Sequence, residues 1–341
     1  MATGSVAKVK RSKRMNKRST SVQLLRVSAC FLVFLVHFGQ RAGFSGALLS
    51  LSNFGAYGVQ LFLLISGYLA GKTFIDNPDT SVLIYYKKRA ISLLPLYYLV
   101  ILYYFITENI LNQIVSVIPN DELGIGWLRY IFLLNGFLNS DTYFWSNLGI
   151  TWTIPIFAFF YLIAPWILRK IKSKYSSIII WFVIFVLTQV LNCFYSCVIF
   201  NELHWMFLGV VIYTCVKYRY TSIATVVISI ITIGVTILGS PTYVYGGIFS
   251  CIMLALLGTD DLALPEWLQR IIDVLDKYSY TIYLMHGVVF CSLINRLVSL
   301  GTNKIIIVIV AILGTFLATF IVGKFIEKPI QRFLKKKLIK E

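Results

Sequence analysis

The sequence has few charged residues, and acidic residues are especially scarce. Of its 341 residues, 13% are charged, 14 are Asp or Glu, and 58% are hydrophobic. A soluble domain needs a far more polar surface than this composition supplies. Several apolar runs reach the roughly 20 residues with which a helix crosses a bilayer. The composition therefore excludes a soluble globular protein and predicts an all-α, polytopic transmembrane helix bundle surrounded by lipid.

The motifs of several familiar sites are also missing. The six cysteines show neither disulfide nor metal-ligand spacing, and the three histidines are dispersed without paired carboxylates. There is no Walker-type or Gly-rich phosphate loop. No basic and aromatic module lies outside the apolar runs, although the net charge is +17. We therefore expect neither a bound metal nor a nucleic-acid partner.

The positive charge is concentrated near the two ends of the chain. Seven Lys or Arg lie between Lys8 and Arg18, and seven more between Lys324 and Lys340. Basic flanks of membrane spans usually face the cytosol. No A-x-A-like cleavage site follows the first apolar run, so we expect a retained first span. The predicted parts are a basic cytosolic tail over 1–20, a transmembrane domain over 21–328 and a basic cytosolic tail over 329–341.

The pattern of apolar runs and charged loops predicts about ten membrane spans, with both termini in the cytosol. The expected spans are about 22–40, 54–71, 90–107, 148–168, 176–195, 202–217, 221–238, 243–258, 279–299 and 304–325. Gly43–Asn53 is expected to be a short outer loop. Trp127–Leu138 is too short to cross and is expected to be re-entrant or interfacial. Apolar residues at helical spacing within Asp260–Lys277 predict an amphipathic helix on the membrane surface.

Two ionisable residues interrupt the first apolar run. Arg26 and His37 are eleven residues apart, which is close to three helical turns, so both project from one stripe together with Cys30 and Val33. An ionisable side chain inside the bilayer costs about 2.5–3.5 kcal/mol on insertion scales and normally faces protein or water. Alternatively, Arg26 extends to the lipid head groups and His37 lies at the outer interface. The shared stripe favours a polar pathway.

Five motifs in order resemble the membrane-bound acyltransferase-3 family. The first is the pair Arg26 and His37, which matches the arginine and histidine of that family's first span. The other four are residues 58–69 (GVQLFLLISGYL), 89–98 (RAISLLPLYY), 279–286 (SYTIYLMH) and 327–329 (EKP). The likeness extends along nearly the whole chain.

The sequence departs from the family pattern at two motifs. The second arginine of the family's R-x-x-R loop falls at Ser92. The family's W-S-L-S-V-E-x-x-F-Y becomes WTIPIFAFFY over 152–161, without a carboxylate. These departures are typical of a divergent branch, so the substrate follows less directly from the resemblance than the fold does.

The resemblance implies an O-acyltransferase of a bacterial cytoplasmic membrane that modifies a cell-surface polysaccharide or its lipid-linked precursor. The implied donor is cytosolic acetyl-CoA or another acyl-CoA. Arg26, Lys87, Lys88 and Arg89 are the expected contacts of its phosphates, although the last three also fit an ordinary cytosolic flank. Ester formation needs a base of near-neutral pKa, so His37 is the expected catalytic residue with Arg26. His37 would act either as the base or as a nucleophile that carries the acyl group.

Ser279, Tyr280 and His286 are expected to line the same cavity, unless His286 is simply a buried, hydrogen-bonded residue. His204 lies beside Trp205, a pattern typical of an interfacial anchor. The alternative function is a transporter or exporter of a lipid-linked glycan or small metabolite, and a weaker one is acylation of a protein, peptide or lipid head group. The absence of an internal repeat favours the enzyme over the transporter. The acceptor sugar, the acyl group and the oligomeric state stay open.

Overall fold

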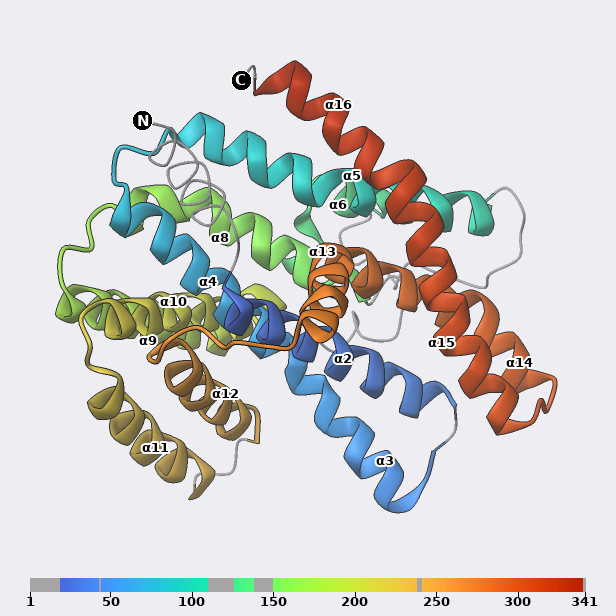
Figure 1. Cartoon of the computed structure of the whole chain (residues 1–341), viewed down its shortest axis with the longest axis horizontal. Helices are drawn as coiled ribbons and strands as arrows, with labels where there is room; N and C mark the ends of the chain where they lie inside the picture. The colour runs from blue at the N-terminus through green and yellow to red at the C-terminus, as the bar shows by residue number, and fades with distance from the viewer. Residues whose placement is uncertain (1–18, 43, 110–125, 138–149, 238–240, 340–341) are drawn as a thin grey trace, which may run out of the picture.

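The computed structural model describes residues 19–42, 44–109, 126–137, 150–237 and 241–339 (Figure 1). Within these residues every regular element is a helix and no strand occurs. In chain order the elements are α2 (Thr20–Arg41), α3 (Gly46–Asn53), η1 (Phe54–Tyr57), α4 (Gly58–Asp76), α5 (Val82–Asn109), α6 (Trp127–Ile131), η2 (Leu134–Phe137), α8 (Thr153–Leu168), α9 (Lys174–Phe194), α10 (Val198–Lys217), α11 (Thr221–Ile237), α12 (Pro241–Leu257), α13 (Glu266–Val289), η4 (Phe290–Ile294), α14 (Asn295–Ser299), α15 (Lys304–Ile321), η5 (Val322–Glu327) and α16 (Lys328–Leu338).

The described helices form a multi-pass membrane bundle. Eight helical stretches in this part of the chain are long and apolar enough to cross a bilayer, and the two shorter apolar stretches Thr221–Ile230 and Tyr243–Leu257 fall where two further spans were expected. The all-α bundle predicted from the sequence is therefore confirmed. We call the end of the bundle where α2 begins the inner end, because the charge bias predicts that it faces the cytosol, and the opposite end the outer end.

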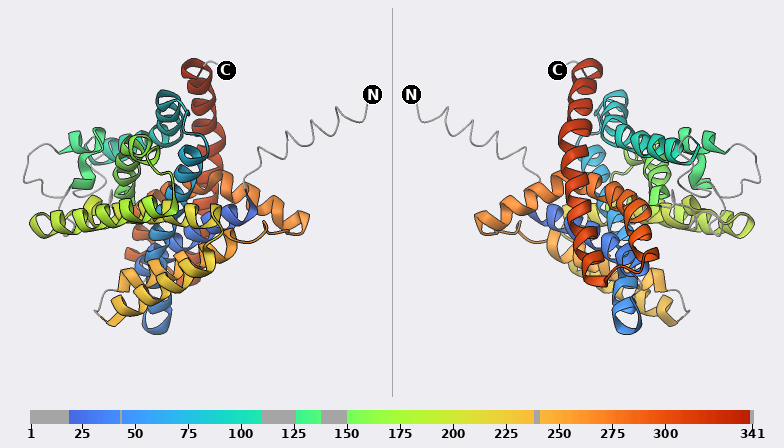
Figure 2. Two further views of the ribbon diagram at one scale, coloured as in Figure 1. Left: turned by 90° about the vertical axis from the view of Figure 1, so that its left-hand side faces the viewer. Right: turned by 90° about the vertical axis from the view of Figure 1, so that its right-hand side faces the viewer.

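Helices α2, α4, α10 and α13 lie at the centre of the bundle (Figure 1). The α11–α12 hairpin flanks them on one side, and α14 and α15 lie on the other. Helix α16 continues the direction of α15 and runs beside α5 (Figures 1 and 2). The central helices bury their side chains against one another, whereas α9 and α15 expose rows of Ile, Val and Phe that suit contact with lipid.

Helices α4 and α10 approach very closely, because glycine lies at their crossing. A Cβ atom at Gly67 would overlap Met206 O, and one at Gly209 would overlap Leu64 O. Near the inner end, Tyr213 donates a hydrogen bond to Asp76, and Lys217 forms a salt bridge of 2.9 Å with the same carboxylate. The glycines set the distance between the helices, and small residues at a crossing are a usual device in membrane bundles.

Several helices extend beyond the predicted spans, and two segments differ in kind from the prediction. The stretch expected to be an outer loop contains the helix α3, because after Gly46, whose φ is +58°, nothing interrupts helical geometry. The amphipathic surface helix and the following span form one continuous helix, α13, which begins at Glu266. A break in the helix was expected because this segment is charged. Asp273 and Asp276 nevertheless lie within the bundle, where they accept hydrogen bonds from α2.

The short apolar segment Trp127–Leu138 does not cross the bundle, as predicted, and its last residue lies outside the described part of the chain. Its described residues form α6, which packs against α5, and η2, which packs mainly against α8 and α10. Tyr97 donates a hydrogen bond to Tyr130 O at 2.7 Å, and Tyr98 donates one to Ile131 O at 2.8 Å. The two tyrosines of α5 thus hold the C-terminal end of α6 against α5 through hydrogen bonds to its carbonyl groups.

The glycine contact between α4 and α10 gives a stability prediction. Gly67→Ala and Gly209→Ala should each lower the free energy of unfolding by about 1–3 kcal/mol, because the added methyl group pushes two backbones apart. Gly71→Ala on the same helix is the matched control, since its Cβ would meet only the Tyr213 side chain at 3.3 Å. Denaturant titration of the solubilised protein measures the three changes. Equal losses for all three variants would contradict the role of the crossing.

Candidate active site

The stripe of α2 that carries Arg26 packs against α13. Arg26 Nη1 lies 2.8 Å from Asp276 Oδ1, and Arg26 Nη2 donates to Ser279 Oγ at 3.2 Å. Cys30 Sγ lies 3.5 Å from Ser279 O, so the next turn of the stripe faces the same helix. Asp276 is buried, whereas 20% of the Arg26 side-chain surface is accessible to solvent. The arginine is therefore held by the protein rather than extended to the lipid head groups.

The start of α2 is fixed by a second carboxylate. Asp261, in the connection before α13, accepts hydrogen bonds from Ser19 Oγ and from the backbone N–H groups of Thr20 and Ser21, at 2.7–3.0 Å. Burial alone would raise the pKa of Asp261, but these hydrogen bonds outweigh it and hold the pKa below its usual value. A negative group at a helix N-terminus also interacts favourably with the helix dipole. The register of α2 along α13 is thereby set at the inner end.

The two histidines predicted from separate motifs lie together. The ring centroids of His37 and His286 are 5.3 Å apart, with the rings inclined by 31°. His286 Nδ1 donates to Ile282 O at 3.2 Å, because that carbonyl can only accept. In the neutral ring this fixes the tautomer, so that His286 Nε2 carries a lone pair, and that atom has no hydrogen-bond partner among the described residues. His286 is thus a buried histidine with one satisfied and one available nitrogen.

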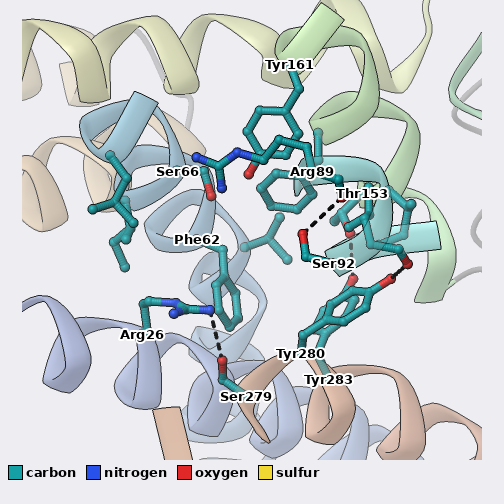
Figure 3. Close-up of a pocket in the computed structure, with 16 residues that line it drawn as sticks. Arg26, Phe62, Ser66, Arg89, Ser92, Thr153, Tyr161, Ser279, Tyr280 and Tyr283 are labelled. Carbon is teal, nitrogen blue, oxygen red and sulfur yellow. Dashed lines mark hydrogen bonds between the residues drawn. The ribbon is translucent and has the colours of Figure 1, made fainter. Parts of the chain in front are cut away.

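A cavity of about 190 Å³ lies between α2, α4, α5, α8 and α13 (Figure 3). Arg26 lines it from α2, and Arg89 lines it from α5. Its other polar lining residues are Ser66, Ser92, Thr153, Tyr161, Ser279, Tyr280 and Tyr283, and the rest of its wall is apolar. It therefore combines two cations and several hydroxyl groups with an apolar surface, which is typical of sites for amphipathic ligands.

Aromatic rings and hydroxyl groups hold the cavity's walls in place. The Arg89 guanidinium lies 5.1 Å from the Tyr85 ring centroid and 4.6 Å from that of Tyr161. Such cation–π contacts orient the cation without neutralising it. On the opposite wall, Tyr283 donates to Ile150 O at 2.8 Å and accepts from Thr153 at 2.9 Å. The cations thus face walls whose side chains are held by ring contacts and hydrogen bonds.

The predicted site residues fall into three groups, which are the cavity lining, the histidine pair and the two lysines of the basic run. Arg26, Arg89, Ser279 and Tyr280 line the cavity. His37 and His286 do not line it. They form a pair one helical turn beyond Tyr283, whose ring lies 5.8 Å from that of His286.

The lysines of the basic run lie outside the cavity. Lys87 Nζ donates to Leu338 O of α16 at 2.8 Å, and Lys88 is exposed. In a helix, consecutive residues point about 100° apart, so the three side chains of the run lie on different faces of α5, and of the three Arg89 lines the cavity. The structure therefore brings Arg89 to the site and leaves Lys87 and Lys88 on other faces of α5.

Both departures from the family pattern fall on the cavity wall. Ser92 replaces the second arginine of the loop motif and donates to Arg89 O at 2.9 Å. Phe157 stands where the family pattern has its carboxylate, and it too lines the cavity. A positive and a negative side chain are thus both absent from one cavity.

Sequence reasoning missed Asp276, the partner of Arg26. A signal for it exists, because Asp276, Ser279, Tyr283 and His286 recur at spacings of three, four and three residues and so share one helical face. The acid was assigned to a surface helix because it lies just before the expected start of the span. Thr153 and Ser66 were missed as well, and a lone hydroxyl residue in an apolar run carries no comparable signal.

His204 is not the interfacial anchor that its neighbour Trp205 suggested. It is buried inside α10, and its ring centroid lies 4.5–5.7 Å from those of Trp205, Phe185 and Tyr243. Neither ring nitrogen has a hydrogen-bond partner among the described residues. His204 belongs to a packed aromatic cluster, away from the cavity and from the histidine pair. No group of three metal-ligating side chains occurs in the described part of the chain.

The ion pair between α2 and α13 gives a second prediction. In a double-mutant cycle, Arg26→Gln and Asp276→Asn should show a coupling of at least about 1 kcal/mol in the free energy of unfolding, because either variant leaves a largely desolvated charge without its counterpart. Denaturant titration of the solubilised protein measures the cycle. The exposed pair Arg270 and Glu266, 3.5 Å apart, is the control, with an expected coupling below about 0.5 kcal/mol. Additive effects of Arg26→Gln and Asp276→Asn would contradict the pairing.

A comparison with protein-family models supports the resemblance seen in the motifs. The model of acyltransferase family 3, described as an acyltransferase domain, matches residues 19–324. No curated protein and no solved structure gave a significant match. The matched region contains α2, the cavity and the histidine pair. The chain is therefore a multi-pass membrane protein that belongs to the acyltransferase-3 family.

Proposed function

We propose that this protein is an O-acyltransferase that moves an acyl group, most simply acetyl, from cytosolic acyl-CoA to a hydroxyl group of a cell-surface polysaccharide or its lipid-linked precursor. The observation that carries the proposal is the placement of Arg26 and His37 on one stripe of α2. That stripe runs from a cavity with two cations to a histidine pair. The proposed location is a bacterial cytoplasmic membrane with both termini in the cytosol.

The cavity suits the donor. Coenzyme A carries several phosphates and an apolar arm that ends in the thioester. Arg26 and Arg89 offer charged hydrogen-bond donors for phosphate, and guanidinium groups bind phosphate oxygens in a bidentate manner. The apolar wall formed by residues such as Phe62 and Phe157 suits the arm. We place the phosphates at the inner end, with the thioester directed along α2 towards His37.

The histidine pair suits the chemistry of ester formation. In the transfer, the acceptor oxygen attacks the thioester carbonyl, a C–O bond forms, and the C–S bond breaks to release the thiolate. We assign His37 as the base that takes the hydroxyl proton and then returns it to the departing thiolate. His286, whose tautomer is fixed by Ile282 O, acts as the neighbour that orients His37. Imidazole performs both proton transfers near neutral pH.

The role of His37 is tested by an activity measurement. Membranes with the wild-type chain or with His37→Ala are incubated with radiolabelled acetyl-CoA and the host's lipid-linked glycan fraction. Incorporation into glycan should fall by about 10²–10⁴-fold in the variant, as expected for the loss of a general base. Binding of acetyl-CoA should stay within about threefold, because His37 does not line the cavity.

The outcomes separate three readings at matched expression. Full incorporation by His37→Ala would remove His37 from the chemistry while keeping the enzyme. No incorporation by either protein, together with no acetyl-CoA binding, would overturn the acyltransferase proposal, and transport of a glycan would then be tested.

Donor binding gives a separate prediction for the basic run. Arg89→Gln should weaken acetyl-CoA binding by roughly tenfold or more, since a charged hydrogen bond contributes about 1.5–3 kcal/mol. Lys88→Gln is the matched control on the same helix, and it should change binding by less than about twofold because Lys88 is exposed and lies outside the cavity lining. Equilibrium binding of labelled acetyl-CoA to the purified protein measures both. Equal weakening of acetyl-CoA binding in both variants would show that the basic run acts through its overall charge and not through a contact of Arg89 in the cavity.

A further inference from the structure

A second cavity, of about 390 Å³, lies at the outer end of the bundle. It is bounded by α5 on one side and by the continuous stretch of η4 and α14 on the other. Its lining includes Tyr103, Thr107, Ser292, Asn295, Arg296 and Ser299. This lining is largely polar, in contrast to the wall of the donor cavity.

The two cavities are at opposite ends of one helix interface. On α5, the donor cavity ends at Leu93 and the outer cavity begins at Tyr103. Ten residues of helix correspond to roughly 15 Å. On the partner stretch, the donor cavity ends at Tyr283 and the outer cavity begins at Cys291, so His286 lies between them in register. The outer cavity is thus beyond the histidine pair, at the end of the interface opposite the donor cavity.

The π-helical segment η4 shapes this cavity. It begins directly after α13, and its extra residue per turn changes which side chains face α5. Phe290 and Ile294 are buried in a cluster that also contains Phe38 of α2, whereas Ser292 lines the cavity. The hydroxyl groups of Ser292 and Tyr103 lie 2.7 Å apart and share a hydrogen bond. The segment therefore packs against α2, which carries His37, through Phe290 and Ile294, and it lines the outer cavity through Ser292.

The charge of the cavity indicates what it binds. Arg296 is a cation of its lining, and no carboxylate occurs among the described lining residues. Arg296 forms no ion pair within the described part of the chain. The hydroxyl and amide groups around it can both donate and accept hydrogen bonds. This combination suits a polyhydroxylated ligand that also carries a negative group, because guanidinium binds carboxylate and phosphate strongly.

We propose that the outer cavity is the acceptor subsite and that it takes an anionic sugar, with Arg296 on the carboxylate or phosphate and Tyr103, Ser292 and Asn295 around the hydroxyl groups. The assignment of this cavity to the acceptor of the transfer reaction rests on the proposed function. The cavity itself, its polar lining and its single described cation are independent of it. The anionic group is either the carboxylate of a uronic acid or the phosphate of a sugar phosphate, and the experiment distinguishes the two.

The test is equilibrium binding to the purified full chain in lipid nanodiscs, where both faces are accessible. The probes are glucose, glucuronate and glucose 1-phosphate, and acetyl-CoA binding is measured on the same samples. At least one anionic sugar should bind roughly tenfold or more tightly than glucose. Arg296→Gln should abolish that preference, whereas Arg296→Lys should retain part of it. The anionic sugar that is preferred identifies carboxylate or phosphate as the recognised group.

The matched control is Arg270→Gln, an exposed arginine near the inner end, which should leave all binding unchanged. Arg296 is itself exposed, so its replacement should not prevent folding. Equal binding of the three sugars, or a preference for anionic sugars that survives Arg296→Gln, would overturn the inference. If acetyl-CoA binds in that case, the proposed function stands without this subsite. If the Arg296-dependent preference appears and acetyl-CoA does not bind, the anionic-sugar site stands and the acyltransferase proposal fails.

Discussion

A partly buried ion pair between two residues that are 250 positions apart in the chain determines how the site is assembled. Arg26 on α2 and Asp276 on α13 each need the other, because an unpaired charge between helices in a membrane is costly. Once they pair, the two helices run in the same direction from the inner end. The register that follows brings Cys30 to Ser279 and His37 to His286. Asp261 strengthens this arrangement by holding the first residues of α2.

The rest of the bundle serves to keep that pair of helices against a fixed wall. The close crossing of α4 and α10 at Gly67 and Gly209 makes a rigid unit, and α4 presents Phe62 and Ser66 to the cavity. Glu327, in η5, accepts hydrogen bonds from Thr281 and from Gln331 Nε2, and Gln331 also contacts Ser92 O of α5. Glu327, from the last of the family motifs, therefore connects α13 to α5 through Gln331. This connection gives the motif a structural role.

The wall of the cavity is where this sequence departs from the pattern of the family motifs. Ser92 and Phe157 stand where the pattern has an arginine and a glutamate, and both lie on the wall of the same cavity. Neither Ser92 nor Phe157 brings a charge to the cavity, so its described cations are Arg26 and Arg89. Arg26, Arg89 and the histidine pair are all retained. These two departures thus leave in place the groups to which we assign chemistry.

The sequence by itself determined the membrane class, the helical bundle and the stripe of Arg26 and His37, because composition and helical periodicity are local properties of the chain. It also placed Arg26, Arg89, Ser279 and Tyr280 among the candidates that the cavity unites. Only the tertiary structure decided that Asp276 holds Arg26, that Lys87 and Lys88 point away, that His204 is buried in an aromatic cluster, and that a polar cavity lies beyond His286. Each of these depends on which helices become neighbours. That choice is made by burial and charge pairing between distant segments, and no local pattern records it.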